Sequence, residues 1–243
     1  MTKHTLLPED RLFGPGREQK EIALNLYSQI KDIPLVCPHG HVDPAIFAKS
    51  NYRFSSPTEL LIIPDHYVFR MLHSQGYSLE ELGISPITDQ DIPVETNHRK
   101  IWQIFAENFY LFRGTPTGIW ITQELLEVFG VDQILNEKNA QTIYDQIEDC
   151  LAKPEYQPRN LFKRFNIKVL CTTDSATDPL IHHQAIRDSG WDGKILPTFR
   201  PDSVTNIDTP KWQQHIRSLS DCSGVDIKDY KTYIQALENR RQY

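Results

Sequence analysis

Two histidines separated by one glycine, His39 and His41, are the residues of this sequence best suited to bind a metal ion. They directly follow the apolar segment 34–37, which is typical of a short buried strand. Because residues i and i+2 of a strand point to the same face, both imidazoles can aim at one point. Neutral imidazole is a common ligand of zinc and similar ions. We therefore predict a divalent metal site with zinc as the expected ion; the alternative is a pair of solvated loop histidines.

Three adjacent polar side chains, Asp65, His66 and Tyr67, form a second candidate site. Imidazole and phenol groups can act as an acid, a base or a hydrogen-bond donor, which makes His66 and Tyr67 candidate catalytic residues. The alternative is an ordinary helix start, in which Asp65 caps the helix and Tyr67 packs against the protein.

A candidate anion-binding residue, Arg200, follows the apolar segment 194–198, which predicts another strand. A guanidinium group at a strand end can hold a carboxylate through two parallel hydrogen bonds. The sequence therefore predicts that Arg200 binds an acidic substrate; the alternative is an ion pair with Asp202 or another acid.

Asp174 is a candidate substrate-binding residue, because its carboxylate could orient a substrate hydroxyl. It ends the polar segment 172–174, which we expect to be a turn, and it could equally serve only to close that turn. His182 and His183 occur in the helix predicted to follow. Adjacent helical residues diverge, so we do not expect these two to share a metal ion.

The elements that must position these residues are three strands and many helices. Apolar segments near residues 35, 169 and 196 predict the strands, and a helix between the last two indicates parallel pairing. The segment between the first two strands carries almost only helical signals, among them an aromatic stripe expected in a core. We expect three parts: residues 1–42 with the first helix and strand, residues 43–165 as a helical insertion, and residues 166–243 with further βα units.

Composition excludes several classes of protein. Of the 243 residues, 39% are hydrophobic, and the formal net charge is -6, which argues against a broad basic surface for nucleic acid. No run approaches the roughly 20 apolar residues of a membrane span. The four cysteines are far apart and form no CxxC motif, so we expect reduced thiols in a cytoplasmic protein. The expected partner is a small molecule rather than nucleic acid or a membrane, and a homo-oligomer is left open.

Several of these motifs, in this order, resemble those of the uronate isomerases, the glucuronate isomerase family of the amidohydrolase superfamily. The resemblance rests on His39-Gly40-His41, Asp65-His66-Tyr67 with Arg70 and Met71, the stretch 120–130, Thr172-Thr173-Asp174 with Asp178, His182 and His183, and Arg200-Pro201-Asp202. It implies an α/β fold: an amidohydrolase-type (β/α)8 TIM barrel with a large helical insertion after the first strand.

The resemblance also implies an activity. Family members catalyse an aldose–ketose isomerisation in uronate catabolism, interconverting D-glucuronate with D-fructuronate and D-galacturonate with D-tagaturonate through an enediol. By position, His39 and His41 would be the metal ligands. His66 and Tyr67 would be active-site groups near the sugar, and Arg200 would bind the substrate.

The strand count leaves two possibilities: either the sheet stays open, or the chain is only part of a larger fold. Three strands cannot close a barrel, which needs about eight, and family members are longer, with further metal-site residues in later strands. We therefore expect a barrel truncated to about its first three strands, with little activity on its own. The alternatives to a uronate isomerase function are a metal-dependent hydrolase of the same superfamily and a non-catalytic barrel remnant.

Overall fold

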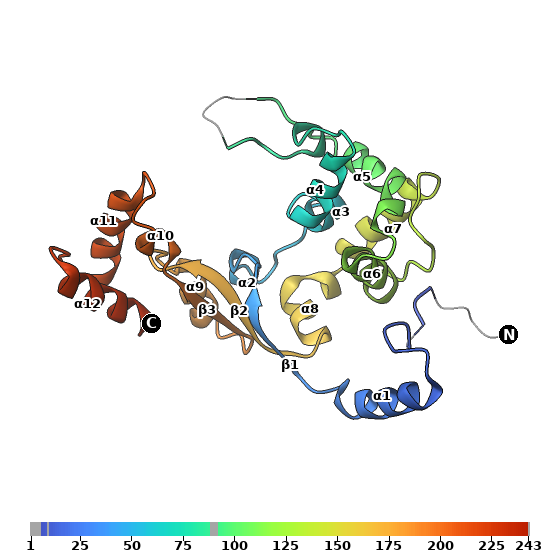
Figure 1. Ribbon diagram of the computed structural model, residues 1–243, viewed down its shortest axis with the longest axis horizontal. Coiled ribbons are helices and arrows are strands. Elements are labelled where there is room, and N and C mark those ends of the chain that lie inside the picture. Colours follow the sequence, from blue (N-terminus) through green and yellow to red (C-terminus); the bar gives the residue numbers. More distant parts are fainter. Residues whose placement is uncertain (1–5, 9, 88–91, 243) are drawn as a thin grey trace. The chain divides into compact units, whose positions relative to one another are not determined.

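The computed structural model describes residues 6–8, 10–87 and 92–242, and the chain divides into two compact units. Unit 1 comprises residues 1–31 and 53–157, and unit 2 comprises residues 32–52 and 158–243. The helical segment 53–157 is therefore inserted into the sequence of unit 2, after the first strand (Figure 1).

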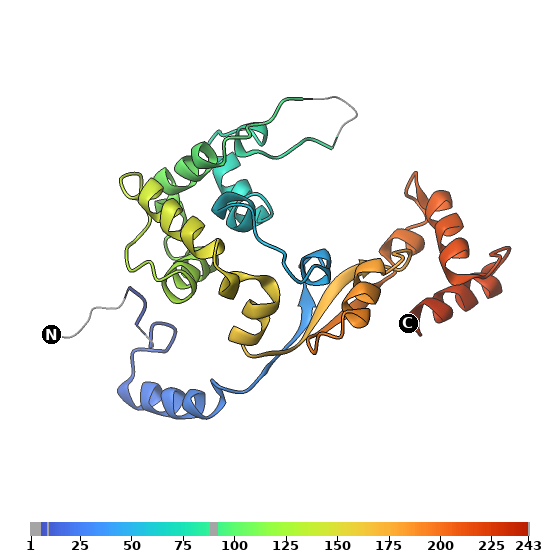
Figure 2. The same ribbon diagram turned by 180° about the vertical axis from the view of Figure 1, so that it is seen from behind.

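Unit 2 contains a three-stranded parallel sheet in the order β1-β2-β3 (Figures 1 and 2). The strands are β1 (Leu35–Gly40), β2 (Ile167–Ser175) and β3 (Lys194–Arg200). β2 and β3 pair without interruption from Val169↔Lys194 to Ser175↔Arg200, whereas the pairing of β1 with β2 has two register shifts. The predicted α/β class and parallel pairing are confirmed.

The predicted turn at 172–174 is wrong, because these residues belong to β2 and pair with Pro197–Phe199 of β3. The neighbouring strand supplies backbone partners, so the local side-chain bonds that favour a turn do not decide the conformation. All three strands extend past their apolar segments into polar residues. As a result His39, Asp174 and Arg200 lie within strands.

One face of the sheet, which we call the helix-covered face, carries Leu170, Thr172 and Asp174, the three buried residues of β2. Leu170 packs with Ile195 of β3 and Ile186 of α9 (Ile181–Asp188) in one hydrophobic cluster. The same cluster includes Phe47 of α2 (Ala45–Ala48) and Phe162 of α8 (Pro158–Arg164).

The opposite face, which we call the exposed face, carries the alternate residues of each strand. Its apolar members keep much of their surface: Val36 is 61% exposed and Leu196 is 47% exposed. Strand alternation and register place Thr173 and Arg200 on this face as well.

The last three helices of unit 2 pack around their own cluster of Ala176, Val204, Leu219 and Ala236. They are α10 (Asp202–Thr205), α11 (Trp212–Ser223) and α12 (Tyr230–Arg241). Arg240 of α12 donates to Asp178 O at 2.6 Å and to Ala176 O at 3.1 Å. This arginine therefore ties α12 to the loop that follows β2.

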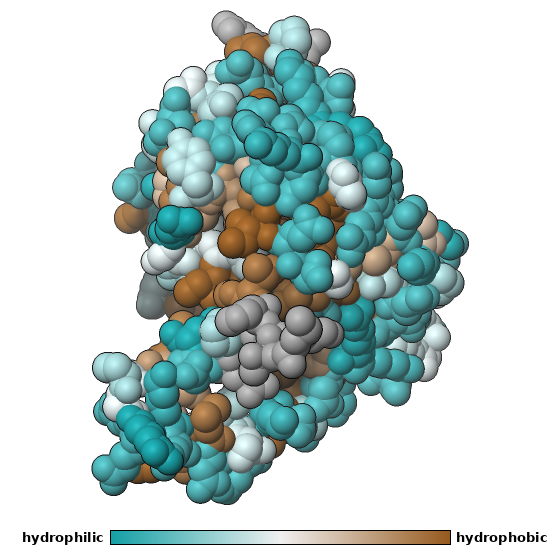
Figure 3. Space-filling view, turned by 90° about the vertical axis from the view of Figure 1, so that its right-hand side faces the viewer, coloured by the Kyte–Doolittle hydropathy of each residue, from teal (hydrophilic) through white to brown (hydrophobic). Residues whose placement is uncertain are grey.

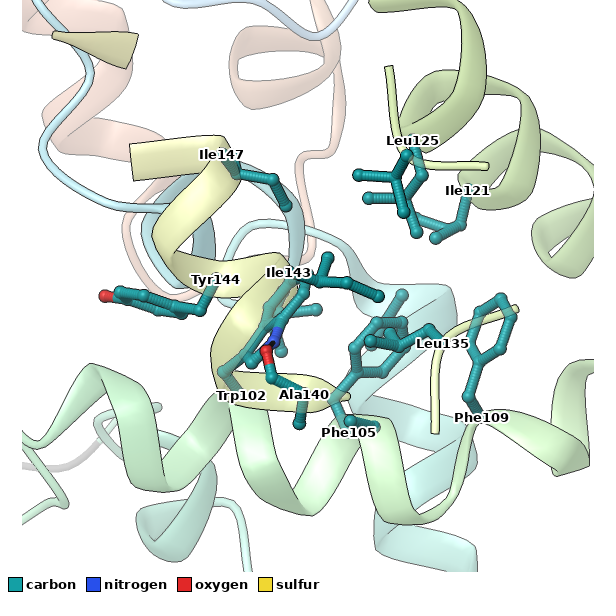
Figure 4. Packing of buried hydrophobic residues seen from close by; sticks show 14 of the residues in the cluster. Trp102, Phe105, Phe109, Ile121, Leu125, Leu135, Ala140, Ile143, Tyr144 and Ile147 are labelled. Atoms are coloured by element: carbon teal, nitrogen blue, oxygen red, sulfur yellow. Dashed lines mark hydrogen bonds between the residues drawn. The ribbon is translucent and has the colours of Figure 1, made fainter. Parts of the chain in front are cut away.

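Unit 1 is helical and has one extensive core. Its main helices are α1 (Arg17–Ile30), α3 (Pro57–Leu61), α4 (His66–Ser74), α5 (His98–Glu107), α6 (Pro116–Gln123) and α7 (Ala140–Leu151). Short helical turns occupy Glu80–Leu82, Phe109–Phe112, Glu124–Val128 and Pro154–Tyr156. The predicted aromatic stripe is buried here: Phe105 and Trp102 lie against Tyr144 and Ile143 of α7 (Figure 4).

The two ends of the inserted segment meet within unit 1, where the Arg53 guanidinium donates to Ala152 O. Unit 1 also has an apolar pocket of about 680 Å³ between Phe109, Ile119 and Leu135. Hydrophobic side chains reach the surface of this unit among hydrophilic ones (Figure 3). Among the described residues, no helix combines the length and apolarity that crossing a membrane requires.

Candidate active site

His39 and His41 converge. Their Nε2 atoms are 2.8 Å apart, and the ring centroids are 4.6 Å apart with the planes at 76°. Gly40 lies between them, close to β2: a Cβ there would come within 2.8 Å of Cys171 O. A side chain at position 40 would therefore push the two strands apart, so glycine allows the close approach that holds both imidazoles on one side.

The donor set fits a divalent metal ion. Two nitrogens bound to tetrahedral zinc lie about 3.3 Å apart, given Zn–N distances of about 2.05 Å. The observed 2.8 Å needs only a small opening of the pair to reach that separation. In the described part of the chain, no third His, Cys, Asp or Glu completes a group of three. The metal-binding role of His39 and His41 stays a prediction.

Thr173 lies beside this pair on the exposed face. Its Oγ1 is 3.5 Å from His41 Nδ1, at the outer limit of a hydrogen bond. A contact at Nδ1 leaves Nε2 directed toward His39. A hydrogen bond to the ring nitrogen that does not bind the metal typically fixes the orientation of a metal-binding imidazole.

Arg200 ends β3 and pairs with Ser175 of β2. Its Nε lies 3.4 Å from Asp202 Oδ2, so the ion pair named as the alternative is present. The side chain remains 45% exposed, which leaves the guanidinium accessible to solvent. With β2 between them, β3 with Arg200 and β1 with His39 lie about 10 Å apart, and His41 directly follows β1. The three side chains lie on the same face.

Asp174 lies on the helix-covered face, away from the histidine pair. Its Oδ2 accepts a hydrogen bond from Thr172 Oγ1 at 2.6 Å and lies 3.8 Å from His183 Nε2. The structure thus does not bring Asp174 together with Arg200 and the histidines, and its substrate-binding role stays a prediction.

His66 and Tyr67 belong to unit 1, where they begin α4. Asp65 caps this helix by accepting from Tyr67 N at 2.8 Å and Val68 N at 3.3 Å, so the helix start named as the alternative is present. Tyr67 is not packed as that alternative supposed, since the residue is 58% exposed. The two rings lie together, with centroids 4.2 Å apart, and their catalytic roles stay predictions.

An acid that sequence reasoning missed, Glu124, belongs to the same unit. It begins a single turn of π-helix, Glu124–Val128. The surrounding protein atoms, and then the Asp65 carboxylate, raise the pKa of Glu124 to about 6, although the residue as a whole is exposed. No pattern in the sequence identifies this environment, because it arises from tertiary packing.

The sequence model of one protein family, described as glucuronate isomerase, matches residues 17–243. The chain belongs to the glucuronate isomerase family. The resemblance inferred from the motifs is thereby confirmed.

Curated relatives agree with this family membership. The chain is 53% identical to a uronate isomerase of Nostoc punctiforme over 243 residues, which is 100% of the chain and 51% of that protein. It is 44% identical to a uronate isomerase of Rhizobium meliloti over 238 residues, 98% of the chain and 50% of that protein. The chain therefore spans about half the length of the curated relatives it matches.

Solved structures of this family share the fold. A crystal structure of glucuronate isomerase from Caulobacter crescentus matches with a TM-score of 0.90 and 41% identity over 97% of this chain and 48% of that one. A uronate isomerase structure from Thermotoga maritima matches with a TM-score of 0.84 and 28% identity over 98% of this chain and 49% of that one.

His183, which the sequence indicated only as a neighbour of His182 that was not expected to share a metal ion with it, is a buried polar residue in the structure. Burial lowers its pKa, an effect that Asp174 and Asp178 oppose. The available signal was the spacing of His183 and Ile186, three residues apart on α9, which places both on its buried face.

Proposed function

We propose that this chain contributes the metal-binding and carboxylate-binding part of a uronate isomerase. The reaction would interconvert D-glucuronate with D-fructuronate, and D-galacturonate with D-tagaturonate. The observation that supports this most directly is the convergence of His39 and His41 on the sheet face that also carries Arg200. Parallel α/β folds place their active sites at the carboxyl ends of strands, where these residues lie.

The proposal includes the wider architecture. The sheet would be part of a (β/α)8 barrel of the amidohydrolase type, with its exposed face toward the barrel interior. The parallel order β1-β2-β3 and the helices on the opposite face support this assignment. A cytoplasmic location is also proposed; it rests on the spacing of the four cysteines, which are free thiols in the structure.

Arg200 is the proposed ligand of the sugar carboxylate. The chain carries a formal net charge of -6, so it exerts no overall attraction on an anionic substrate, and a local cation must hold it. Asp202 Oδ2 lies 3.4 Å from Nε of the guanidinium. The two terminal nitrogens can then face a second carboxylate.

The chemistry requires two proton transfers. A base removes the proton from C2 of the aldose, O1 gains a proton, and an enediol forms. A proton is then added to C1 while O2 loses its hydroxyl proton, so that one proton has moved from C2 to C1 and one from O2 to O1. His66 and Tyr67 are the proposed groups that hold or move these protons. A divalent metal ion held by His39 and His41 would supply stabilisation of the negative charge on the sugar oxygens.

The test is an isomerase assay with D-glucuronate and added zinc, with formation of the keto product as the readout. It compares the 243-residue chain with the same chain fused to the second half of the Nostoc punctiforme relative. We expect turnover from the fusion and little from the chain alone, because catalytic zinc normally takes three protein ligands. Turnover by the chain alone at the rate of the fusion would contradict this division of the site.

Variants of the fusion test the residue assignments. His39→Ala or His41→Ala should abolish turnover and bound zinc together, whereas His215→Ala, which removes a histidine outside the candidate site, should preserve both. Zinc binding that survives loss of both His39 and His41 would remove these residues from the metal site.

A further inference from the structure

Three buried polar side chains contact one another on the helix-covered face of unit 2. Thr172, His183 and Asp174 are 0%, 5% and 9% exposed, respectively. Thr172 Oγ1 lies 2.6 Å from Asp174 Oδ2 and 2.8 Å from His183 Nε2. Buried polar groups are nearly always hydrogen-bonded, and here the partners are supplied by each other.

Counting the protons gives these hydrogen bonds a direction. An ionised carboxylate only accepts, so the single hydroxyl proton of Thr172 goes to Asp174. The other acceptor within reach, Leu196 O, is farther away at 3.3 Å. Thr172 Oγ1 must then accept from His183, which requires a proton on Nε2. The order is therefore His183 Nε2–H to Thr172 Oγ1–H to Asp174 Oδ2.

We propose that His183 is a positioning residue for the histidine pair on the opposite face of the sheet. Its hydrogen bond fixes the side chain of Thr172, which in turn fixes that of Asp174. These two residues flank Thr173 in β2, so holding both restrains the backbone at the residue between them. Thr173 projects to the other face, where its hydroxyl lies 3.5 Å from His41 Nδ1.

This coupling acts across one strand. Alternate residues of β2 point to opposite faces, so a displacement of Thr172 or Asp174 moves Thr173 through the shared backbone rather than through solvent. The inference rests on the proposed function only in that it treats His41 as a metal ligand. The hydrogen-bond order itself rests on the distances and burial of the three side chains.

Nuclear magnetic resonance of the ¹⁵N-labelled 243-residue chain tests the first step. Long-range ¹⁵N–¹H correlation spectra distinguish a neutral imidazole protonated at Nε2 from one protonated at Nδ1 and from imidazolium. At pH 7 we expect His183 to be neutral and protonated at Nε2. The Nδ1-protonated tautomer or a charged imidazolium at that pH would overturn the proton order.

Variants test the second step, with the imidazole signals of His41 as the readout. His183→Leu removes the donor and should shift the His41 signals, whereas His183→Gln retains an N–H donor and should keep them near the wild-type positions. His182→Leu is the matched control on the same helix and should leave them unchanged. Unchanged His41 signals in a folded His183→Leu chain would overturn the positioning role and leave a purely local network.

A second pair of variants covers the case in which His183→Leu does not fold. Thr172→Ser retains the relay hydroxyl and should preserve the His183 tautomer and the His41 signals, whereas Thr172→Val removes the relay at nearly constant shape and should alter both. Equal spectra for these two variants would overturn the proposal. None of these readouts requires turnover, so a fusion without isomerase activity would count against the proposed function alone.

Discussion

Replacing Arg240 with methionine should release the loop that follows β2. The guanidinium donates to Asp178 O at 2.6 Å and to Ala176 O at 3.1 Å, and it reaches Cys222 O at 3.5 Å. Methionine keeps an apolar stem of similar length but removes every donor, so these carbonyl groups lose their charged partner.

The expected cost follows from the two short hydrogen bonds. Hydrogen bonds that involve a charged group contribute about 1.5–3 kcal/mol each to stability, so both together contribute about 3–6 kcal/mol. Arg240 is only partly buried, and water can replace part of what is lost. We therefore expect the loop and the end of β2 to lose about 2–3 kcal/mol of local stability.

Hydrogen exchange read by mass spectrometry measures this loss on peptides that cover residues 167–178. Each 1.4 kcal/mol corresponds to a tenfold change in an opening equilibrium, so these amides should exchange about 30- to 140-fold faster in Arg240→Met. The matched control is Arg241→Met, which removes an exposed charge from the same helix end. Equal exchange of these peptides in both variants would refute the role assigned to the Arg240 hydrogen bonds.

In the fusion protein, Arg200→Lys should lower kcat/KM for glucuronate by about 30-fold, or about 2 kcal/mol, because an ammonium group cannot form the planar two-bond contact; an unchanged value would remove Arg200 from the site. The raised pKa of Glu124, about 6 against 4.5 in the unfolded chain, contributes stability below pH 4.5 that is lost as the pH rises through 6. Glu124→Gln should therefore stabilise unit 1 at pH 7.5 by about 1 kcal/mol, a figure reduced for solvent contact from a limit of about 2 kcal/mol. It should have little effect at pH 4.5, and thermal unfolding that shows the same difference at both pH values would contradict this. Phe105→Ala should destabilise unit 1 by about 3–5 kcal/mol in urea unfolding, whereas Tyr110→Ala, at a residue 66% exposed, should cost much less; similar losses would contradict the assigned core.

The sequence was sufficient to predict the three strands and the convergence of His39 and His41, because both depend on local patterns. Apolar segments mark the strand centres, and the i, i+2 spacing places two side chains on one face. The family could also be inferred, since several motifs occur in order, and the comparisons confirm it.

The environment of Asp174 could not be predicted, because it depends on pairing with β3, more than 20 residues farther along the chain. Once the segment 172–174 is a strand, alternation turns Asp174 toward α9 and Thr173 toward His41. His183 becomes interpretable only when that register is known. The environment of Glu124 likewise depends first on the protein atoms that surround it in the folded unit and then on Asp65, which is distant in sequence.

The insertion of unit 1 between β1 and β2 has a consequence for the order of folding. Pairing Leu35 with Ile167 in an unfolded chain closes a loop of roughly 130 residues, and such closure has an entropic cost that grows with loop length. The Arg53–Ala152 contact joins the two ends of the inserted segment once unit 1 has folded. The loop left to close is then roughly 30 residues, which reduces the closure cost by about 1.3 kcal/mol. During synthesis, β1 would remain unpaired until unit 1 has folded, and β2 would pair with it afterwards.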